Sequence, residues 1–326
     1  MRNGSGKRYW LGLDVGGTKI LAAAVTDGLE IVEARRTATR RGEGPRAVLE
    51  RSVALLEELQ ARRGPALGLG VGFAGLVDWK RGVVSSSIML PGWDGFPLAS
   101  ALSEALSGIP VFADNDATAA GWGEYLALGS PPGLTMVLLT VGTGIGGAII
   151  VEGRLFRGAC GTSAEFGNTT IDWRGERCWC GNRGCLNTLA SGSAISARAA
   201  VLADAAEESL LKGLERPIPV DRIAEAARAG DRAAARAIEE GARALGAGVA
   251  NLVNIFNPER VVITGGVSVL GEEYLRIVRE EAAWRAFKEN AEHARIETSV
   301  VGPEVGVLGA AGLARDHFRE GRSGKD

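Results

Sequence analysis

Two aspartates flank an asparagine at Asp114, Asn115 and Asp116, a combination that could carry acid–base chemistry. Residues 111–112 before them predict a short strand, and residues 116–128 predict a helix. A carboxylate at a helix N-terminus lies at the positive end of the helix dipole, which keeps it ionised. An ionised aspartate can take the proton of a hydroxyl group while that oxygen attacks phosphorus. Because Asp and Asn are also ordinary helix caps, we expect one of the two aspartates to serve only as a cap.

A glycine-rich segment follows the first apolar run and has the residue types of a phosphate-binding loop. The segment comprises Asp14, a valine, Gly16, Gly17, Thr18 and Lys19. Its glycines allow the backbone to approach a phosphate and to offer N–H donors, and its threonine adds a hydroxyl donor. The aspartate stands where it could hold a hydrated Mg²⁺ ion. The same residues also suit a type I′ hairpin turn with a solvated aspartate, and the motif alone does not decide between the two.

A second glycine-rich segment contains Gly142, Thr143, Gly144 and Gly147. The glycines match the spacing of the dinucleotide fingerprint, but that fingerprint requires a helix next, and residues 148–151 predict a strand. No Gly-Lys-Ser/Thr follows, so the segment is not a Walker loop. A hairpin that presents a threonine and backbone amides fits a phosphate better than a dinucleotide.

A third glycine pair, Gly265 and Gly266, follows a predicted strand at residues 261–264. Glycines at a strand end could admit an adenine ring or could simply turn the chain. Taken alone, this pair favours the turn.

Three of the four cysteines, Cys178, Cys180 and Cys185, lie close together in a segment without strong periodicity. In a chain of cytosolic composition such a cluster suggests a metal before a disulfide. Zinc orders loops of this kind with four nitrogen or sulfur ligands. The fourth ligand is not evident, because both histidines lie far along the chain and Cys160 is the only other cysteine.

The elements that must position these residues follow from the apolar pattern. Short apolar runs predict a strand meander near the N-terminus, and an alanine-rich, helical stretch occupies residues 188–256. This order predicts an α/β protein with two lobes. We place the boundary near Ala113, which gives a small lobe at 1–113 and a large lobe at 114–302 that contains the cysteine-rich loop.

Composition narrows the class of function. The 326 residues include 46% apolar residues and carry a net charge of −2, from 37 basic and 39 acidic residues. Without a block of like charge, we expect neither nucleic acid nor a membrane surface as a partner. The chain also lacks a signal-peptide run and a membrane-length apolar window, so we expect a cytoplasmic protein.

Taken together, the motifs and their order resemble the ROK family, which comprises repressors, uncharacterised reading frames and sugar kinases within the actin-like, hexokinase-like ATPase superfamily. The resemblance covers the chain from Asp14 to about Ala314. It implies a ribonuclease H-like, two-lobed α/β fold with a cleft between the lobes. It also implies a last helix, at about 303–320, that packs on the first lobe. ATP and Mg²⁺ are the implied cofactors, and a homodimer is the family's habit.

The resemblance also implies roles for the phosphate side. The segment from Asp14 to Lys19 is similar to the family's first phosphate loop, and the segment from Gly142 to Gly144 to its second. The pair at 265–266 is similar to its adenosine motif.

On the sugar side, Asn115 and Asp116 match the sugar-binding pair in which the aspartate is the catalytic base, which leaves Asp114 as the cap. Glu165 matches a glutamate that grips sugar hydroxyls, and Gly75 falls in a loop that lines the sugar site.

Three sugar-side positions depart from the family pattern. Asn168 replaces a histidine that serves zinc and sugar, Asn187 replaces a glutamate, and Met89 replaces an asparagine. A buried site rejects ligands that leave its polar groups unpaired, so such changes should alter specificity. The changes favour an amino- or deoxy-hexose, with glucose still possible. The changed histidine also bears on zinc: either Cys160 or a water completes the site, or the loop holds no metal.

The resulting hypothesis is ATP-dependent phosphorylation of a hexose, by family analogy at the 6-hydroxyl. Three alternatives are weighed against it. A repressor would need an N-terminal DNA-binding domain, for which a first strand near Tyr9 leaves no room. A sugar-binding sensor without catalysis agrees with the changed sugar positions but not with the intact phosphate motifs. A nicotinamide-dependent oxidoreductase has only the glycine spacing in its favour.

Overall fold

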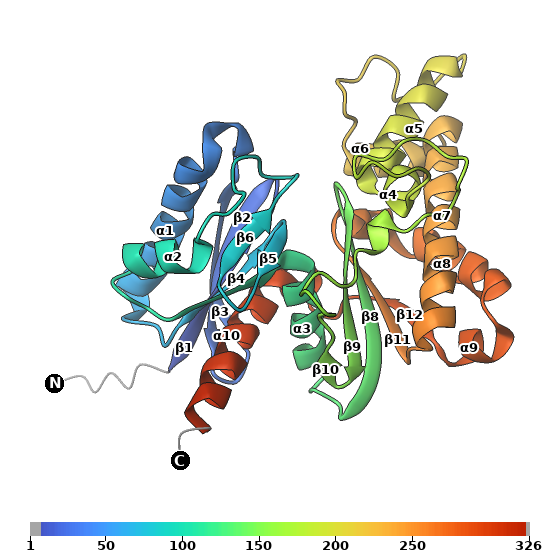
Figure 1. Ribbon diagram of the computed structural model, residues 1–326. Helices are drawn as coiled ribbons and strands as arrows, with labels where there is room; N and C mark the ends of the chain where they lie inside the picture. The colour runs from blue at the N-terminus through green and yellow to red at the C-terminus, as the bar shows by residue number, and fades with distance from the viewer. Residues whose placement is uncertain (1–7, 324–326) are drawn as a thin grey trace. The chain divides into compact units, whose positions relative to one another are not determined.

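The computed structural model describes residues 8–323, which form a mixed α/β structure (Figure 1). Two compact units divide the chain. The first unit comprises three segments: the chain up to Pro132, Ala148–Ser163, and the chain from Pro303 on. The second unit comprises Gly133–Gly147 and Ala164–Gly302. The helix that follows Asn115 belongs to the first unit, whereas the expected lobe boundary near Ala113 assigned it to the second lobe. The lobe boundary itself stays a prediction.

A five-stranded sheet forms the centre of the first unit. Its strands are β3 (Ile31–Ala38), β2 (Lys19–Thr26), β1 (Tyr9–Val15), β4 (Leu69–Phe73) and β7 (Val111–Asn115), in that spatial order. The pairs β1–β2 and β2–β3 are antiparallel, while β1–β4 and β4–β7 are parallel. Val15, Phe73 and Asn115 lie side by side in the register. The carboxyl ends of three parallel strands therefore meet at one edge, where ligands commonly bind in α/β sheets.

Helices cover this sheet because its strands alternate between two faces. Leu11 and Leu13 of β1 belong to a buried apolar cluster with Leu56 and Leu59 of α1 (Gly44–Arg63). The same unit holds α2 (Leu98–Ala105), α3 (Asp116–Ala127) and α10 (Val305–Ser323). The hairpin of β5 (Leu76–Asp78) and β6 (Val83–Ser86) was not anticipated, because its strands are too short to show a period.

The opposite face of the sheet contacts α10 without side chains in between. Gly12 of β1 and Gly70 of β4 are partners in the register. A Cβ atom at Gly12 would lie 2.1 Å from the carbonyl oxygen of Val307, and one at Gly70 only 1.7 Å from that of Ala310. The backbone of α10 therefore rests directly on the two strands. The expectation that the last helix packs on the first lobe is consistent with these contacts.

A second glycine contact joins α10 to α3. A Cβ atom at Gly309 would lie 1.7 Å from the carbonyl oxygen of Ala119, and one at Gly123 would lie 2.4 Å from that of Val305. The two helices thus approach more closely than any larger residue would permit, and α10 fixes the position of α3 against the sheet.

The second sheet has the order β10-β9-β8-β11-β12, with β11 parallel to both of its neighbours. Its strands are β8 (Gly133–Val141), β9 (Ile145–Glu152), β10 (Arg154–Leu155), β11 (Arg260–Thr264) and β12 (Arg295–Thr298). A strand, β9, follows the second glycine-rich segment, which agrees with the rejection of the dinucleotide fingerprint. The helices of the second unit are α4 (Leu186–Ala190), α5 (Gly192–Ala205), α6 (Val220–Arg228), α7 (Arg232–Phe256), α8 (Gly271–Arg285) and α9 (Lys288–His293).

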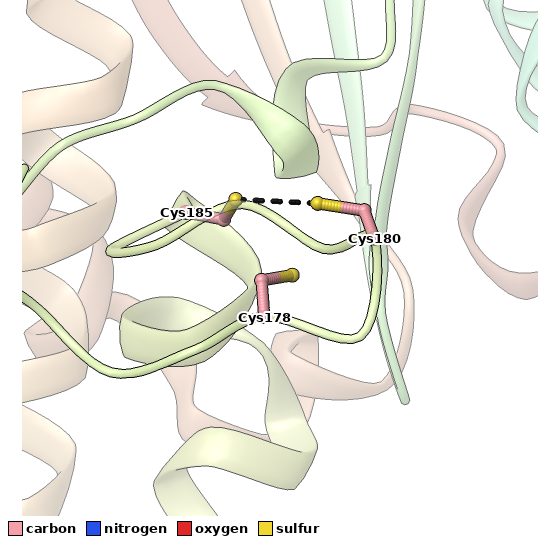
Figure 2. Close-up of side chains that lie close together, drawn as sticks. All are labelled: Cys178, Cys180 and Cys185. Atoms are coloured by element: carbon pink, nitrogen blue, oxygen red, sulfur yellow. Dashed lines mark hydrogen bonds between the residues drawn. The ribbon is translucent and has the colours of Figure 1, made fainter.

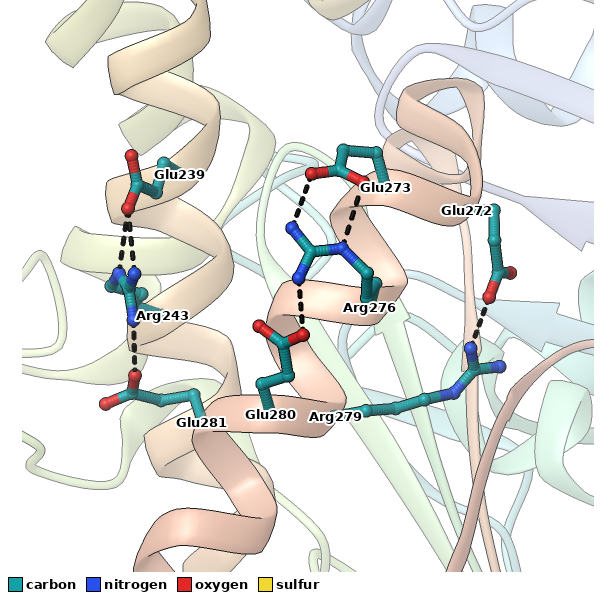
Figure 3. Close-up of polar contacts among 8 residues, drawn as sticks. All are labelled: Glu239, Arg243, Glu272, Glu273, Arg276, Arg279, Glu280 and Glu281. Carbon is teal, nitrogen blue, oxygen red and sulfur yellow. Dashed lines mark hydrogen bonds and ion pairs between the residues drawn. The ribbon is translucent and has the colours of Figure 1, made fainter.

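Arginines on α7 and α8 are held by neighbouring glutamates (Figure 3). Arg243 bonds to Glu239 and to Glu281, and so joins the two helices. The same picture shows Arg276 with Glu273 and Glu280, and Arg279 with Glu272. Because each cation is paired with an acid, this face is a surface ion-pair network, whose members individually stabilise the fold little. None of the described helices has the length and apolar character needed to cross a membrane.

The glycine contacts predict a large effect of a single methyl group. We expect Gly70→Ala to lower the free energy of unfolding by about 3 kcal/mol or more, because the new Cβ would overlap the Ala310 carbonyl and push α10 off the sheet. Gly42→Ala is the matched control, since a Cβ there meets nothing within 4 Å and should change stability by less than about 0.5 kcal/mol. Urea unfolding measures both, and equal stability of the two variants would contradict the prediction.

Candidate active site

The edge where β1, β4 and β7 end brings Asp14 and Asp116 together. Burial raises the pKa of the Asp14 carboxyl to about 7, the neighbouring Asp116 carboxylate acts in the same direction, and Lys19 opposes them. Burial also raises the pKa of Asp116, against hydrogen bonds from the Ala117 amide and Asn115. The helix N-terminus favours the ionised form of Asp116, and burial acts against it. Two partly buried carboxyls at one edge form a site that favours a bound cation or proton.

Asn115 is the cap of α3, which corrects the expectation that Asp114 takes this role. The Asn115 Oδ1 accepts a hydrogen bond from Thr118 N at 3.0 Å. Its Nδ2 donates to Oδ1 of Asp116 at 3.0 Å and to the carbonyl of Gly75 at 3.0 Å. The Asp116 Oδ1 also accepts from its neighbour's amide, Ala117 N, at 2.9 Å. The capping asparagine therefore orients the carboxylate that sequence analysis selected as the base.

Asp114 instead ends β7 as a buried partner of Arg157. Its side chain is 1% exposed, and its Oδ2 lies 3.0 Å from Nε and 2.9 Å from the second guanidinium nitrogen of Arg157. The guanidinium also stacks on Trp79, with its carbon 4.5 Å from the ring centroid. A buried carboxylate requires such a partner, because an unpaired charge away from water is costly. Sequence analysis missed Arg157, since no motif surrounds it.

The first glycine-rich segment is a turn between the antiparallel strands β1 and β2, and its role as a phosphate loop stays a prediction. The Gly16 amide donates to the Lys19 carbonyl at 3.0 Å, and the Thr39 hydroxyl donates to the Gly16 carbonyl at 2.6 Å. Thr18 and Lys19 are exposed. Met89 lies against this turn, because a Cβ at Gly17 would be 3.1 Å from the Met89 methyl group. The first unit thus brings the predicted residues Met89, Gly75, Asn115 and Asp116 to the side of the first loop.

The second glycine-rich segment is held from three directions. The Gly142 amide donates to the Gly144 carbonyl at 2.8 Å, and the Gly192 amide at the start of α5 donates to the Gly142 carbonyl at 2.7 Å. Gly265 has a φ of 102° and lies so close to Val141 that a Cβ would be 2.6 Å from its carbonyl oxygen. The structure therefore places the third glycine pair, 265–266, beside the second loop, as a shared nucleotide site would require.

The remaining sugar-side predictions lie together in the second unit. The Asn168 Nδ2 donates to Oε2 of Glu165 at 3.1 Å, and the Asn168 Oδ1 accepts from Nδ2 of Asn187 at 2.9 Å. Asn187 is buried and accepts from the Ile145 amide at 2.7 Å. The amides at 168 and 187 thus contact one another and the end of the second loop.

The three clustered cysteines converge on one point (Figure 2). Their sulfur atoms lie within 4.8 Å of one another, and those of Cys180 and Cys185 are 3.6 Å apart. Sulfur ligands about 2.3 Å from a tetrahedral zinc ion are separated by roughly 3.8 Å, so the arrangement fits this metal. Burial raises the pKa of the Cys185 thiol to about 12, while a backbone hydrogen bond at Asn182 lowers that of Cys180. The Asn168 carbonyl accepts from Cys185 Sγ at 3.6 Å.

A family model described as the ROK family matches residues 10–317. The chain belongs to this family, and the resemblance noted in its motifs is confirmed. A crystal structure of a ROK family glucokinase from Streptomyces griseus, in complex with glucose and AMPPNP, superposes with a TM-score of 0.86. It shares 35% sequence identity and covers 94% of this chain and 99% of the glucokinase. The predicted fold class, α/β of the actin-like ATPase type, is confirmed.

Relatives of known name include enzymes and a regulator. A glucokinase from Halalkalibacterium halodurans is 31% identical over 98% of both chains. An N-acetylmannosamine kinase from Citrobacter koseri is 36% identical over 94% of this chain and 98% of its own. A xylose repressor from Caldicellulosiruptor bescii is 36% identical over 76% of this chain and 62% of its own. The two kinases match this chain nearly from end to end, whereas a large part of the repressor lies outside its match with this chain.

The raised pKa of Asp14 predicts how stability changes with pH when metal and nucleotide are absent. The carboxyl titrates at about 7 in the folded protein and near 3.8 when unfolded, so the folded protein binds more protons between these values. Stability therefore falls as the pH rises through this window. We expect Asp14→Asn, which cannot ionise, to lose this fall, so that its Tm relative to wild type increases from about pH 5 to about pH 8.

Thermal unfolding over this pH range measures the difference. Asp221→Asn, at an exposed first-turn residue of α6, is the control and should follow wild type. A Tm difference between Asp14→Asn and wild type that stays constant with pH would contradict the assigned shift.

Proposed function

We propose that this protein is an ATP-dependent sugar kinase that phosphorylates a hexose or a modified hexose, at the 6-hydroxyl by family analogy. The observation that carries the proposal is the Asn115–Asp116 pair, whose carboxylate is oriented by the cap of α3 at the edge that also holds Asp14. The kinases among the relatives support the same reaction.

Asp116 acts as the general base in this proposal. Its carboxylate takes the proton of the sugar hydroxyl while the hydroxyl oxygen forms a bond to the γ-phosphorus of ATP. The bond from that phosphorus to the bridging oxygen breaks, and ADP leaves with that oxygen. A base is most effective when its pKa lies near the working pH, so the burial that raises the pKa of Asp116 suits this task.

The two glycine-rich loops serve the nucleotide. Phosphoryl transfer depends mainly on positioning and on neutralising charge. The amides of Gly142 and Ile145 are already engaged within the protein, so Thr143 and Gly144 are the residues proposed to meet a phosphate. Mg²⁺, when bound, supplies positive charge to the phosphates, and Asp14 would hold it through its water shell. A pKa near neutrality means that the protein destabilises the negative charge of Asp14, and a bound cation would stabilise it.

The sugar is proposed to be recognised by Gly75, Met89, Asn115, Glu165, Asn168 and Asn187, besides Asp116. An amide or thioether presents different donors and acceptors from a carboxylate, so these residues should prefer a hexose whose substituents differ from those of glucose. An amino- or deoxy-hexose is the proposed class.

A non-catalytic sugar sensor is the second candidate function. The xylose repressor among the relatives favours it, since 62% of that protein matches this chain. A sensor would bind sugar but would not release ADP. The homodimer expected from the family stays a prediction in either case.

The deciding experiment measures ADP release from Mg-ATP with a panel of hexoses, including amino-, acetamido- and deoxy-analogues, against a blank without sugar. We expect sugar-dependent release, with a modified hexose giving the largest kcat/KM. Glucose far ahead of every analogue would overturn the proposed substrate class. Sugar binding by calorimetry without ADP release would instead favour the sensor.

Removing the base should stop turnover without preventing binding. We expect Asp116→Asn to lower kcat by about 10²- to 10⁴-fold, because its amide oxygen still accepts from Ala117 but no longer takes a proton. The Kd for ATP and sugar should stay within a few-fold of wild type. Asp221→Asn, exposed on α6, is the matched control with wild-type kcat. A kcat near wild type in Asp116→Asn would remove this residue from the role.

We also propose a structural zinc ion held by Cys178, Cys180 and Cys185. The sulfur spacing supports it, and the ion would order the irregular segment around these cysteines. Protein purified without added metal should contain about one zinc per chain by elemental analysis, and Cys180→Ser should lose most of it. Cys160→Ser is informative as a second variant, since loss of zinc there would identify the fourth ligand. Wild type without zinc would refute the assignment.

A further inference from the structure

A continuous chain of side-chain amides joins the second glycine-rich loop to Glu165. The Ile145 amide donates to Oδ1 of Asn187 at 2.7 Å, and Nδ2 of Asn187 donates to Oδ1 of Asn168 at 2.9 Å. The Asn168 Nδ2 then donates to Oε2 of Glu165 at 3.1 Å. Both asparagines use the oxygen on one side and the nitrogen on the other, so the chain has a direction.

Both ends fix this direction. A backbone N–H can only donate, so Asn187 must turn its oxygen toward Ile145. An ionised carboxylate can only accept, so Asn168 must turn its nitrogen toward Glu165. With both ends set, neither amide can flip without placing two donors or two acceptors face to face. Each asparagine therefore determines which residue type the other position can hold.

The surrounding backbone restricts the Asn187 end of the chain, whereas the Glu165 end is exposed. Asn187 is only 6% exposed. A Cβ at Gly167 would lie 2.5 Å from the Asn187 Nδ2, so the glycine is required for the amide to reach Asn168. Glu165 is held in a tight turn, because the backbone N–H of Asn168 donates to the backbone carbonyl of Glu165 at 3.0 Å. The residue before it, Ala164, has a φ of 67°, a conformation that costs free energy in any residue but glycine.

We propose that Asn168 and Asn187, in addition to their proposed sugar contacts, are positioning residues that hold Glu165 in a fixed relation to the second glycine-rich loop through this directed amide chain. The functional meaning rests on the proposed function, in which the loop binds phosphate and Glu165 binds the sugar. Glu165 is then presented in one orientation only when the loop end at Ile145 is in place. Asn187→Asp should break the direction, since an aspartate still accepts from Ile145 but offers no donor to Asn168.

The first test reverses the direction of the hydrogen bonds through the Asn168 side chain and needs no enzymatic activity. In Asn187→Asp, the Asn168 amide must flip and present its oxygen to the Glu165 carboxylate, so we expect Tm to fall by roughly 3 °C or more. Glu165→Gln alone should change Tm little, because its amide oxygen still accepts from Asn168. Glu165→Gln combined with Asn187→Asp should recover part of the loss, because the glutamine can donate to the flipped Asn168.

The control removes the side-chain amide of Asn168, which links residues 165 and 187. In an Asn168→Ala background the recovery by Glu165→Gln should vanish, since residues 165 and 187 then have no connection through an amide. Additive Tm changes in the presence of Asn168, or an equal recovery without it, would overturn the proposal.

The second test separates the two ends by kinetics. Asn187→Asp keeps the acceptor for Ile145, so the KM for ATP should stay within about twofold, while the KM for the sugar should rise about tenfold, an order of magnitude typical of one lost polar contact. Asn187→Ala removes both bonds and should raise both values. Equal changes in both KM values for Asn187→Asp would contradict a role in positioning Glu165. If wild type shows no turnover, the proposed function fails while the Tm test still decides the amide chain.

Discussion

The contact of a helix backbone with three glycines sets the geometry of the first unit. Gly12 and Gly70 let α10 lie on adjacent parallel strands, and Gly123 lets α3 approach it equally closely. Such contacts tolerate no side chain, so the distances between sheet and helices are fixed by backbone alone. Asp14 follows Gly12 by two residues, and a Cβ at Gly306 would be 2.9 Å from its carboxylate. The same packing that holds the fold therefore determines where the reactive carboxyls stand.

The carboxyls in turn depend on their burial. Asp14 and Asp116 are close enough for each charge to oppose the other, and burial adds to this cost. Burial raises the pKa of Asp114 as well, but two guanidinium nitrogens of Arg157 contact its Oδ2 and act in the opposite direction. Three acidic groups at one edge are thus differentiated by environment: one is neutralised by an arginine, and two keep a capacity for a cation or a proton. Such differences in environment are what allow similar residues to take separate roles.

Local sequence patterns predicted those features of this protein that depend on residues close together in the chain. The strands β1 and β4 are apolar runs followed closely by glycines, and the Asn115–Asp116 pair stands at a strand–helix junction, so the sequence was sufficient for these features. It was insufficient where the partner is distant. Arg157 is 43 residues from Asp114, and Asn187 is 42 from Ile145, and no spacing rule connects such positions. The resemblance assigns Asn115 and Asp116 to the sugar and so leaves Asp114 as the expected cap. Because aspartate and asparagine are equally good caps, only the end of β7 at Asn115 identifies the actual one.

The position of α10 in the chain has a consequence for biosynthesis. The helix is the last element to be made, yet it completes the unit whose strands are made first. During translation, β1 and β4 leave the ribosome with the glycine face of their sheet uncovered, and it stays so until Val305–Ser323 has emerged. The glycine face of this sheet is therefore covered only after the residues of the second unit have been synthesised.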